Sequence, residues 1–155
     1  MPLSAIAGKS EVLDVVRCNK VTSAGTFNAC PPSMAASLAT LEMLEEGDGA
    51  YYRRVDRHQP RIMAALRASA ARHGHSLLVQ GPRGIFFTEF VGCERAYSAA
   101  DLQGAEVDKS RRLRLLLLEE GVLVGRGNRW FISGELTEED VADVIERVDR
   151  AMARL

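Results

Sequence analysis

The sequence predicts an α+β fold in which helices pack against a small, mainly antiparallel sheet. Two short apolar segments, 76–80 and 85–90, flank the turn Gly81-Pro82-Arg83-Gly84, a pattern typical of a β-hairpin. Longer segments on both sides carry apolar residues every three to four positions, as helices that cover a sheet do. No internal repeat or low-complexity segment interrupts this order.

The beginning of the chain has little periodicity, and we expect a strand or turn followed by a surface loop over residues 2–24. Pro31 and Pro32 then open a helix, because proline is tolerated where the backbone N–H would have no intrahelical partner. Apolar residues recur at helical spacing as far as Leu44, and Gly47 is a suitable C-terminal stop.

A second helix is expected from Gly49 to His73, with Gly74 closing it. Pro60 lies inside this helix and should kink or split it, because it removes one donor and crowds the preceding turn. The change of helix near Gly47 also predicts a domain boundary, which gives domains 1–48 and 49–155.

Beyond the hairpin, Asp108 is the expected N-cap of a helix that runs through Glu120. Two short strands, 122–124 and 129–133, follow on either side of a glycine-rich turn. The last helix begins after Thr137, where an aspartate three residues later forms a near capping box. Its apolar stripe is Val141, Val144, Ile145, Val148 and Met152.

The composition excludes several classes of protein. A chain of 155 residues that is 46% apolar can bury the core of one ordinary domain, and its net charge of −1 favours neither nucleic acid nor an anionic membrane. No segment approaches the roughly 20 apolar residues of a membrane helix, and the first residues lack a secretion signal. Three widely spaced cysteines fit reduced thiols, so we expect a cytoplasmic protein.

The titratable residues give no sign of a metal site or of a catalytic residue. His73 and His75 lack a Cys, Asp or Glu at supporting spacing, so no metal is predicted. Lys9, Lys20 and Lys109 lie in segments that are expected to be polar and solvated. A nucleophilic lysine must be desolvated, and none of the three meets that condition.

The most specific local signal is Gly25-Thr26-Phe27, which stands shortly before the prolines that open the first long helix. A glycine turn with a hydroxyl residue suits an anion held by backbone N–H groups and that hydroxyl. Taken alone, the same residues are more typical of a simple turn and helix cap.

The longer register G-T-F-N-x-x-P-x-S-M-A-A-x-L-A-T-L-E, together with P-L-S-A-I-A-G near the start, resembles class III (subgroup II) aminotransferases, a pyridoxal-phosphate-dependent family. The resemblance implies a fold-type I, α/β enzyme. Residues 1–48 would be a remnant of its cofactor-binding large domain with the connecting helix, and 49–155 its small C-terminal domain. The family usually shows G-N-P where this chain has Asn28-Ala29-Cys30-Pro31-Pro32, a departure that leaves Thr26 in register.

The resemblance also assigns roles to particular residues. In the family, the threonine that corresponds to Thr26 binds the cofactor phosphate of the neighbouring subunit, so Gly25, Thr26 and Phe27 would form the cofactor contact of a homodimer. Arg129 corresponds in place to an arginine that grips the substrate carboxylate as a bidentate pair. Arg126 lies three residues away, and both arginines also suit a solvated loop.

The family's P-L-S-A-I-A-G stretch follows closely after the lysine that forms the Schiff base, so the chain is expected to begin just past that lysine. Two functions then remain open. The chain is part of an enzyme that moves an amino group between a small-molecule donor and a keto acid or aldehyde, or within one molecule. Alternatively, it is a non-catalytic truncated relic, or a partner subunit of a split aminotransferase with a separately encoded N-terminal half. In either case residues 2–46 should expose an unusually apolar surface.

Overall fold

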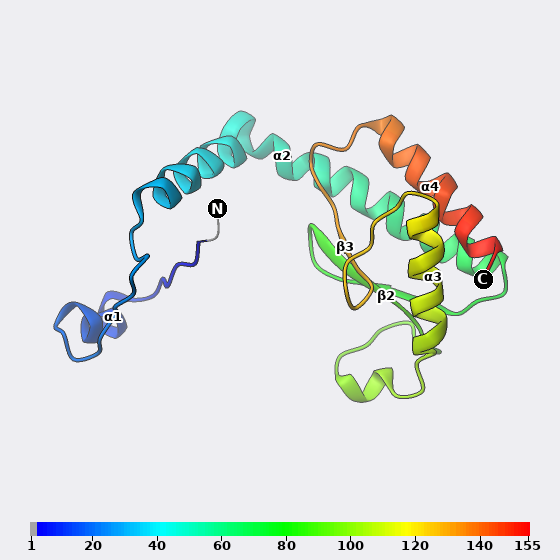
Figure 1. The fold of residues 1–155 in the computed structure, drawn as a ribbon, viewed down its shortest axis with the longest axis horizontal. Helices are drawn as coiled ribbons and strands as arrows, with labels where there is room; N and C mark the ends of the chain where they lie inside the picture. The colour runs from blue at the N-terminus through cyan, green and yellow to red at the C-terminus, as the bar shows by residue number, and fades with distance from the viewer. Residues whose placement is uncertain (1–2) are drawn as a thin grey trace. The chain divides into compact units, whose positions relative to one another are not determined.

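The computed structural model describes residues 3–155 (Figure 1). Met1 and Pro2, and with them the first residue of the P-L-S-A-I-A-G segment, lie outside the described residues. The chain divides into two compact units, Met1–Asp48 and Gly49–Leu155, which are described separately below. Whether the first unit corresponds to part of a cofactor-binding domain stays a prediction.

The first unit contains helix α1 (Ser10–Arg17), a loop, and the beginning of helix α2 (Pro31–Arg72). The sequence prediction of a strand or turn here is wrong, because α1 occupies part of that segment. The signal for α1 was present but short: Val12, Val15 and Val16 recur at helical spacing over only eight residues.

None of the described residues of the first unit is buried. Its apolar side chains stand largely in solvent, with Ile6 88% and Phe27 82% exposed. The other large exposed apolar residues of this unit are Leu3, Val12, Val15, Val16, Val21, Met34, Leu38, Leu41 and Met43. The apolar surface expected over residues 2–46 is therefore present over the described residues of that range.

Helix α2 is a single element, so the expected stop at Gly47 is wrong. Of the two outcomes expected at Pro60, a kink or a split, the split does not occur. The backbone does become left-handed at the unit boundary, with φ of 58°, 55° and 74° at Gly47, Asp48 and Gly49. The helix continues through Pro60, on both sides of which α2 residues are buried in the core of the second unit. Gly74, at φ 77°, follows the end of α2 as expected.

The sheet of the second unit has three antiparallel strands in the order β1-β2-β3. β1 (Leu77–Gln80) and β2 (Ile85–Phe90) form the predicted hairpin, and β3 (Arg129–Phe131) pairs with β2. The strand expected over 122–124 is absent from the described residues. Val122 and Val124 are buried, so their apolar character reflects packing in the core, and only Gly125 bridges to Arg129.

Helices α2, α3 (Val107–Glu119) and α4 (Glu138–Ala153) contribute to one hydrophobic core with the sheet (Figure 1). At its centre the rings of Phe86 and Trp130 stack with centroids 5.6 Å apart. The other buried members are Val55, Ile62, Leu66, Ala70, Val79, Phe90, Leu113, Leu116, Leu117, Val122, Val124, Ile132, Val141, Val148, Ala151 and Met152. Nothing comparable lies in the described part of the first unit, so the mixed α/β fold depends on this core.

The ends of the remaining helices agree with the sequence in one case and differ from it in two. Thr137 caps α4 in a complete capping box, in which its hydroxyl accepts from the Asp140 N–H at 3.1 Å. The prediction that Asp108 caps α3 is wrong, because α3 begins one residue earlier, and Asp108 lies in its first turn. A short 3₁₀ helix, Ala99–Leu102, was not foreseen. No helix in the described part of the chain is long and apolar enough to cross a membrane.

Candidate functional site

The predicted cofactor-binding residues lie in a tight turn between α1 and α2. The Asn28 N–H donates to the Gly25 carbonyl at 3.0 Å, and the Cys30 N–H donates to the Phe27 carbonyl at 3.2 Å. A Cβ on Gly25 would lie 2.7 Å from Oδ1 of Asn28, so glycine allows the asparagine side chain to fold over the turn. The turn therefore depends on Gly25 and Asn28.

Thr26 is exposed, and no described residue forms a hydrogen bond with its hydroxyl or its backbone N–H. The same holds for the N–H of Phe27. Three donors in adjacent positions thus face solvent, just before a helix whose first two residues, Pro31 and Pro32, have no N–H to offer. This donor set fits an anion such as a phosphate group.

The predicted substrate-binding residue, Arg129, lies on strand β3 opposite Phe87. It points away from the core, on the same side of the strand as Phe131, which is 68% exposed. Neither Arg129 nor Arg126 has a side-chain partner among residues 3–155. Thr26 and Arg129 belong to different units, so each is a candidate by itself.

A buried polar network fixes the turn that precedes Arg129. Asn128 is buried in a left-handed conformation (φ 55°), and its Nδ2 donates to Oε2 of Glu89 at 3.1 Å. Glu89 also accepts from the hydroxyl of the buried Ser110 on α3. Sequence reasoning missed this network, because 39 residues separate Asn128 from Glu89. The one local signal was Gly127-Asn128, residues that favour left-handed backbone.

The histidine pair serves packing between helices. His73 Nε2 lies 3.3 Å from Oδ1 of Asp149 on α4, which also accepts from Ser69 at 2.6 Å and Arg72 at 2.7 Å. Hydrogen bonds, first from Ser69 and then from Arg72, hold the pKa of Asp149 below its usual value. Burial lowers the pKa of His75, whose ring meets Phe90 edge-on. The described residues contain no group of three His, Cys, Asp or Glu that would hold a metal.

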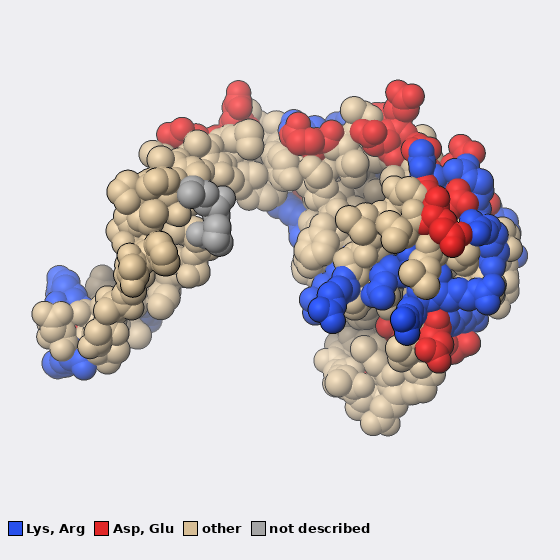
Figure 2. Space-filling model, in the orientation of Figure 1, with Lys and Arg blue, Asp and Glu red and all other residues tan. Residues whose placement is uncertain are grey.

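Five arginines of the second unit form what we call the arginine patch. Of the residues described, none pairs with any of these five through an ion pair or a hydrogen bond to the guanidinium. Several arginines on α2 and α4, by contrast, pair with carboxylates, as Arg150 does with Glu120 at 2.8 Å. Figure 2 shows positive side chains gathered over α3 and the neighbouring loop. The members of the patch are Arg111, Arg112, Arg114, Arg126 and Arg129.

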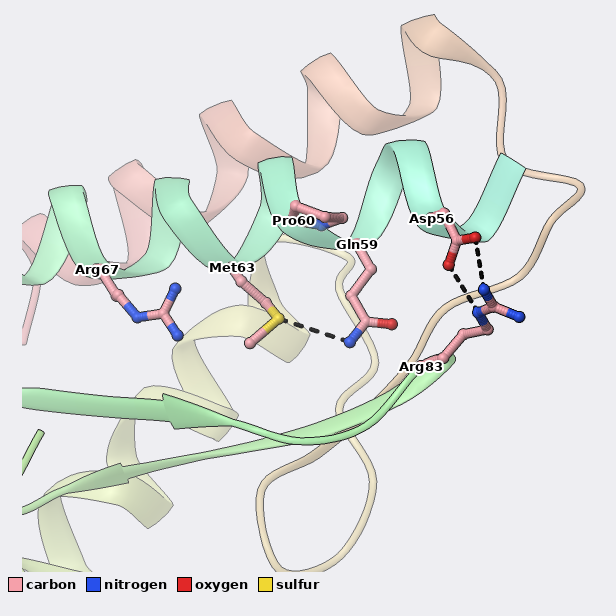
Figure 3. Close-up of a pocket in the computed structure, with 6 residues that line it drawn as sticks. All are labelled: Asp56, Gln59, Pro60, Met63, Arg67 and Arg83. Atoms are coloured by element: carbon pink, nitrogen blue, oxygen red, sulfur yellow. Dashed lines mark hydrogen bonds and ion pairs between the residues drawn. The ribbon is translucent and has the colours of Figure 1, made fainter. Parts of the chain in front are cut away.

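Two adjoining pockets lie in the second unit, between α2 and the hairpin, and neither includes a residue that the sequence analysis named as a candidate site residue. The first has a volume of about 400 Å³ and is lined by Asp56, Gln59, Pro60, Met63, Arg67 and Arg83 (Figure 3). The second, of about 330 Å³, is lined by Met63, Arg67, Val79, Gln80, Gly81, Glu94 and Arg95. Met63 and Arg67 line both, so the pockets lie side by side.

Known proteins resemble this chain in sequence and in fold. The chain is 33% identical over its whole length to glutamate-1-semialdehyde 2,1-aminomutase of Methanopyrus kandleri, and the match covers 36% of that protein. No family model matches the chain. The fold resembles a β-phenylalanine aminotransferase from Variovorax paradoxus, with a TM-score of 0.77, 24% identity, and coverage of 92% of this chain and 33% of that one.

A second solved structure, an omega-transaminase from Sphaerobacter thermophilus, matches with a TM-score of 0.77 and 19% identity over 96% of this chain and 35% of that one. A third, the FumI protein of Sphingopyxis sp. MTA144 in a form with PLP, matches with a TM-score of 0.73 and 23% identity over 95% and 32% of the two chains. The chain fits the C-terminal part of a class III aminotransferase. It spans about a third of the length of the relatives it matches.

Proposed function

We propose that this chain supplies cofactor-phosphate and dimer contacts to a pyridoxal-phosphate-dependent aminotransferase or aminomutase, which moves an amino group from a small-molecule donor to a keto acid or aldehyde. The observation that carries the proposal is the Thr26 turn, whose sequence is in the family's register and whose three donors have no partner among the described residues. When bound, pyridoxal phosphate supplies the electron sink of such a reaction, and the protein supplies orientation and charge.

At the turn, the Thr26 hydroxyl and the N–H groups of Thr26 and Phe27 would hold the phosphate of a cofactor bound mainly by the neighbouring subunit. A dianionic phosphate forms charge-assisted hydrogen bonds, which are about twice as strong as neutral ones. No lysine or arginine lies within the turn, so the interaction rests on these neutral donors.

At β3, Arg129 would bind the carboxylate of the amino-group donor or acceptor. Its planar guanidinium can donate two parallel N–H bonds to a carboxylate, and none of the described residues competes for them. Arg126, next to Gly125, which bridges to Arg129, adds positive potential around it, and this favours anionic substrates. The Asn128–Glu89 hydrogen bond holds the adjoining turn in place.

None of the three lysines is suited to form the Schiff base. Lys109 Nζ lies 3.3 Å from a Glu106 carboxylate oxygen and 4.9 Å from the Phe90 ring centroid, so its amine is engaged by an ion pair and a cation–π contact. Lys9 and Lys20 are exposed. We infer that the chain contributes binding groups rather than the covalent lysine.

The experiment is a titration with pyridoxal phosphate of a dimer reconstituted with an N-terminal half. Thr26→Ala removes one hydrogen bond to a charged group, which should weaken cofactor binding by about 10- to 150-fold. Thr26→Ser keeps the hydroxyl and should keep most of the affinity. Thr40→Ala is the matched control, since the Thr40 hydroxyl bonds within α2 to the Ala36 carbonyl. Equal affinities for the wild type and Thr26→Ala would remove Thr26 from the site.

A partner subunit of a split enzyme is the second candidate, and the solvent-exposed apolar side chains of the first unit favour it. In that case the chain should form a stable complex with a separately expressed N-terminal half. Native mass spectrometry of the mixture would show it, and a mixture that contains only the separate chains would contradict it.

A further inference from the structure

The two adjoining pockets differ in how their charges are satisfied. In the first, Arg83 holds Asp56 in a two-point ion pair, with nitrogen–oxygen distances of 2.7 and 2.8 Å (Figure 3). In the second, neither Glu94 nor Arg95 forms an ion pair with a residue of the described chain. Arg67, which lines both, forms none either. The unneutralised charges are therefore concentrated in the second pocket.

Arg67 and Arg95 retain most of their hydrogen-bonding capacity. Arg67 donates from Nη2 to the Val79 carbonyl on the edge strand, and a guanidinium has five N–H donors in all. The Arg95 guanidinium lies 5.5 Å from the ring centroid of Tyr97, a contact that leaves its edge available. In Figure 3, Arg67 and Met63 extend from α2 on the side that faces the hairpin.

The loop that carries Glu94 and Arg95 is fixed to the sheet. Gln80 on β1 donates from Nε2 to the Ala96 carbonyl at 2.7 Å, and its Oε1 accepts from the Ala96 N–H at 3.0 Å. This two-point contact holds the loop next to β1. Val79, which also lines the pocket, is buried in the core. The pocket is thus largely pre-formed, as small-molecule sites usually are.

We propose that the second pocket binds a small amino acid that carries a second carboxylate. Two guanidiniums and one carboxylate line a space of about 330 Å³ without neutralising one another. An acidic amino acid has the complementary set, with two carboxylates for Arg67 and Arg95 and one ammonium for Glu94. The volume lies in the range of small-molecule sites, roughly 300–1,000 Å³. The pocket shares no residue with the Thr26 turn or with Arg129, so the proposal stands independently of the function proposed above.

The test is a titration of the 155-residue chain with L-glutamate, in which ligand-observed NMR measures binding. Arg95→Gln and Glu94→Gln each remove one charge and should weaken binding by about 10- to 150-fold. Arg112→Gln is the matched control and should bind as the wild type does, because Arg112 is exposed on α3 and has no partner among residues 3–155.

Two analogues test the charge pattern. Glutarate lacks the ammonium group, so it should bind more weakly than glutamate and should not be weakened further by Glu94→Gln. Norvaline lacks the second carboxylate and should also bind more weakly. Absence of saturable glutamate binding, equal binding of all three compounds, or equal loss in Arg112→Gln and Arg95→Gln would each overturn the proposal. Circular dichroism melts of the variants confirm that the chain remains folded in each titration.

Discussion

Gly81 is the residue at which the structure makes its sharpest prediction about stability. It follows β1 at the start of the hairpin turn, and a Cβ added there would lie 2.3 Å from the Phe86 Cα and 2.5 Å from the Ile85 carbonyl oxygen. Both contacts are with backbone, which cannot rotate away. Gly81→Ala must therefore separate the turn from β2, next to the stacked Phe86 and Trp130 rings.

Gly92 is the matched control, because a Cβ on it would meet nothing within 4 Å and its φ is not left-handed. Replacing a glycine by alanine reduces the entropy of the unfolded chain, which stabilises a compatible site by about 0.4–1 kcal/mol. Overpacking costs typically about 1–3 kcal/mol, and more where backbone must move. We expect Gly81→Ala to lower the free energy of unfolding by about 2 kcal/mol or more relative to Gly92→Ala.

Urea denaturation followed by tryptophan fluorescence measures this difference, since the single tryptophan, Trp130, packs directly on Phe86. The denaturation midpoint should fall for Gly81→Ala at an unchanged slope, which separates a loss of stability from a change in the unfolded state. Equal midpoints for Gly81→Ala and Gly92→Ala would refute the reasoning, because the two sites differ in the space around Cβ.

The remaining predictions concern the core, one carboxylate and the lysines. Leu66→Ala, at a fully buried position on α2, should lower the free energy of unfolding by about 2–5 kcal/mol in the same urea assay. Hydrogen bonds, first from Ser69 and then from Arg72, lower the pKa of Asp149 in the folded state. The ionised carboxylate therefore stabilises the fold fully above the unfolded pKa of 3.8, and this stabilisation is lost as the pH falls through the folded pKa. Asp149→Asn should accordingly be less stable than the wild type at neutral pH, and the difference should shrink in acid unfolding curves. Borohydride reduction with pyridoxal phosphate, followed by peptide mapping, should find no specific adduct on the lysines, which are Lys9, Lys20 and Lys109.

Most of the fold was predictable where one local rule sufficed. The hairpin around Gly81 and the capping box at Thr137 each follow from a few adjacent residues, and both were confirmed. The errors lie where tertiary packing outweighs local preference. Pro60 did not split α2, and Val122 and Val124 pack in the core without joining the sheet. Periodicity cannot distinguish an apolar strand from an apolar loop that the core covers.

The candidate sites were predictable to different extents. Thr26 was proposed because its neighbours follow a family register, and Arg129 because it corresponds in place to an arginine of that family. Both stay predictions. The second pocket was not found, because its residues come from α2, β1 and a loop, and Arg67 and Arg95 are 28 positions apart in a sequence rich in arginine. No local pattern separates these arginines from solvated ones. Only the structure shows which of them have partners.

The division into two units determines whether a substitution affects only binding or also the stability of the fold. Arg129 lies on a strand beside the buried core of the unit Gly49–Leu155. A substitution there can therefore change the stability of that unit as well as its binding. Thr26 lies in a unit in which no described residue is buried, and its hydroxyl has no partner among residues 3–155. Loss of that hydroxyl should therefore leave the urea unfolding curve unchanged. Any effect of Thr26→Ala on cofactor affinity then reflects the lost contact itself, since no loss of core packing accompanies it.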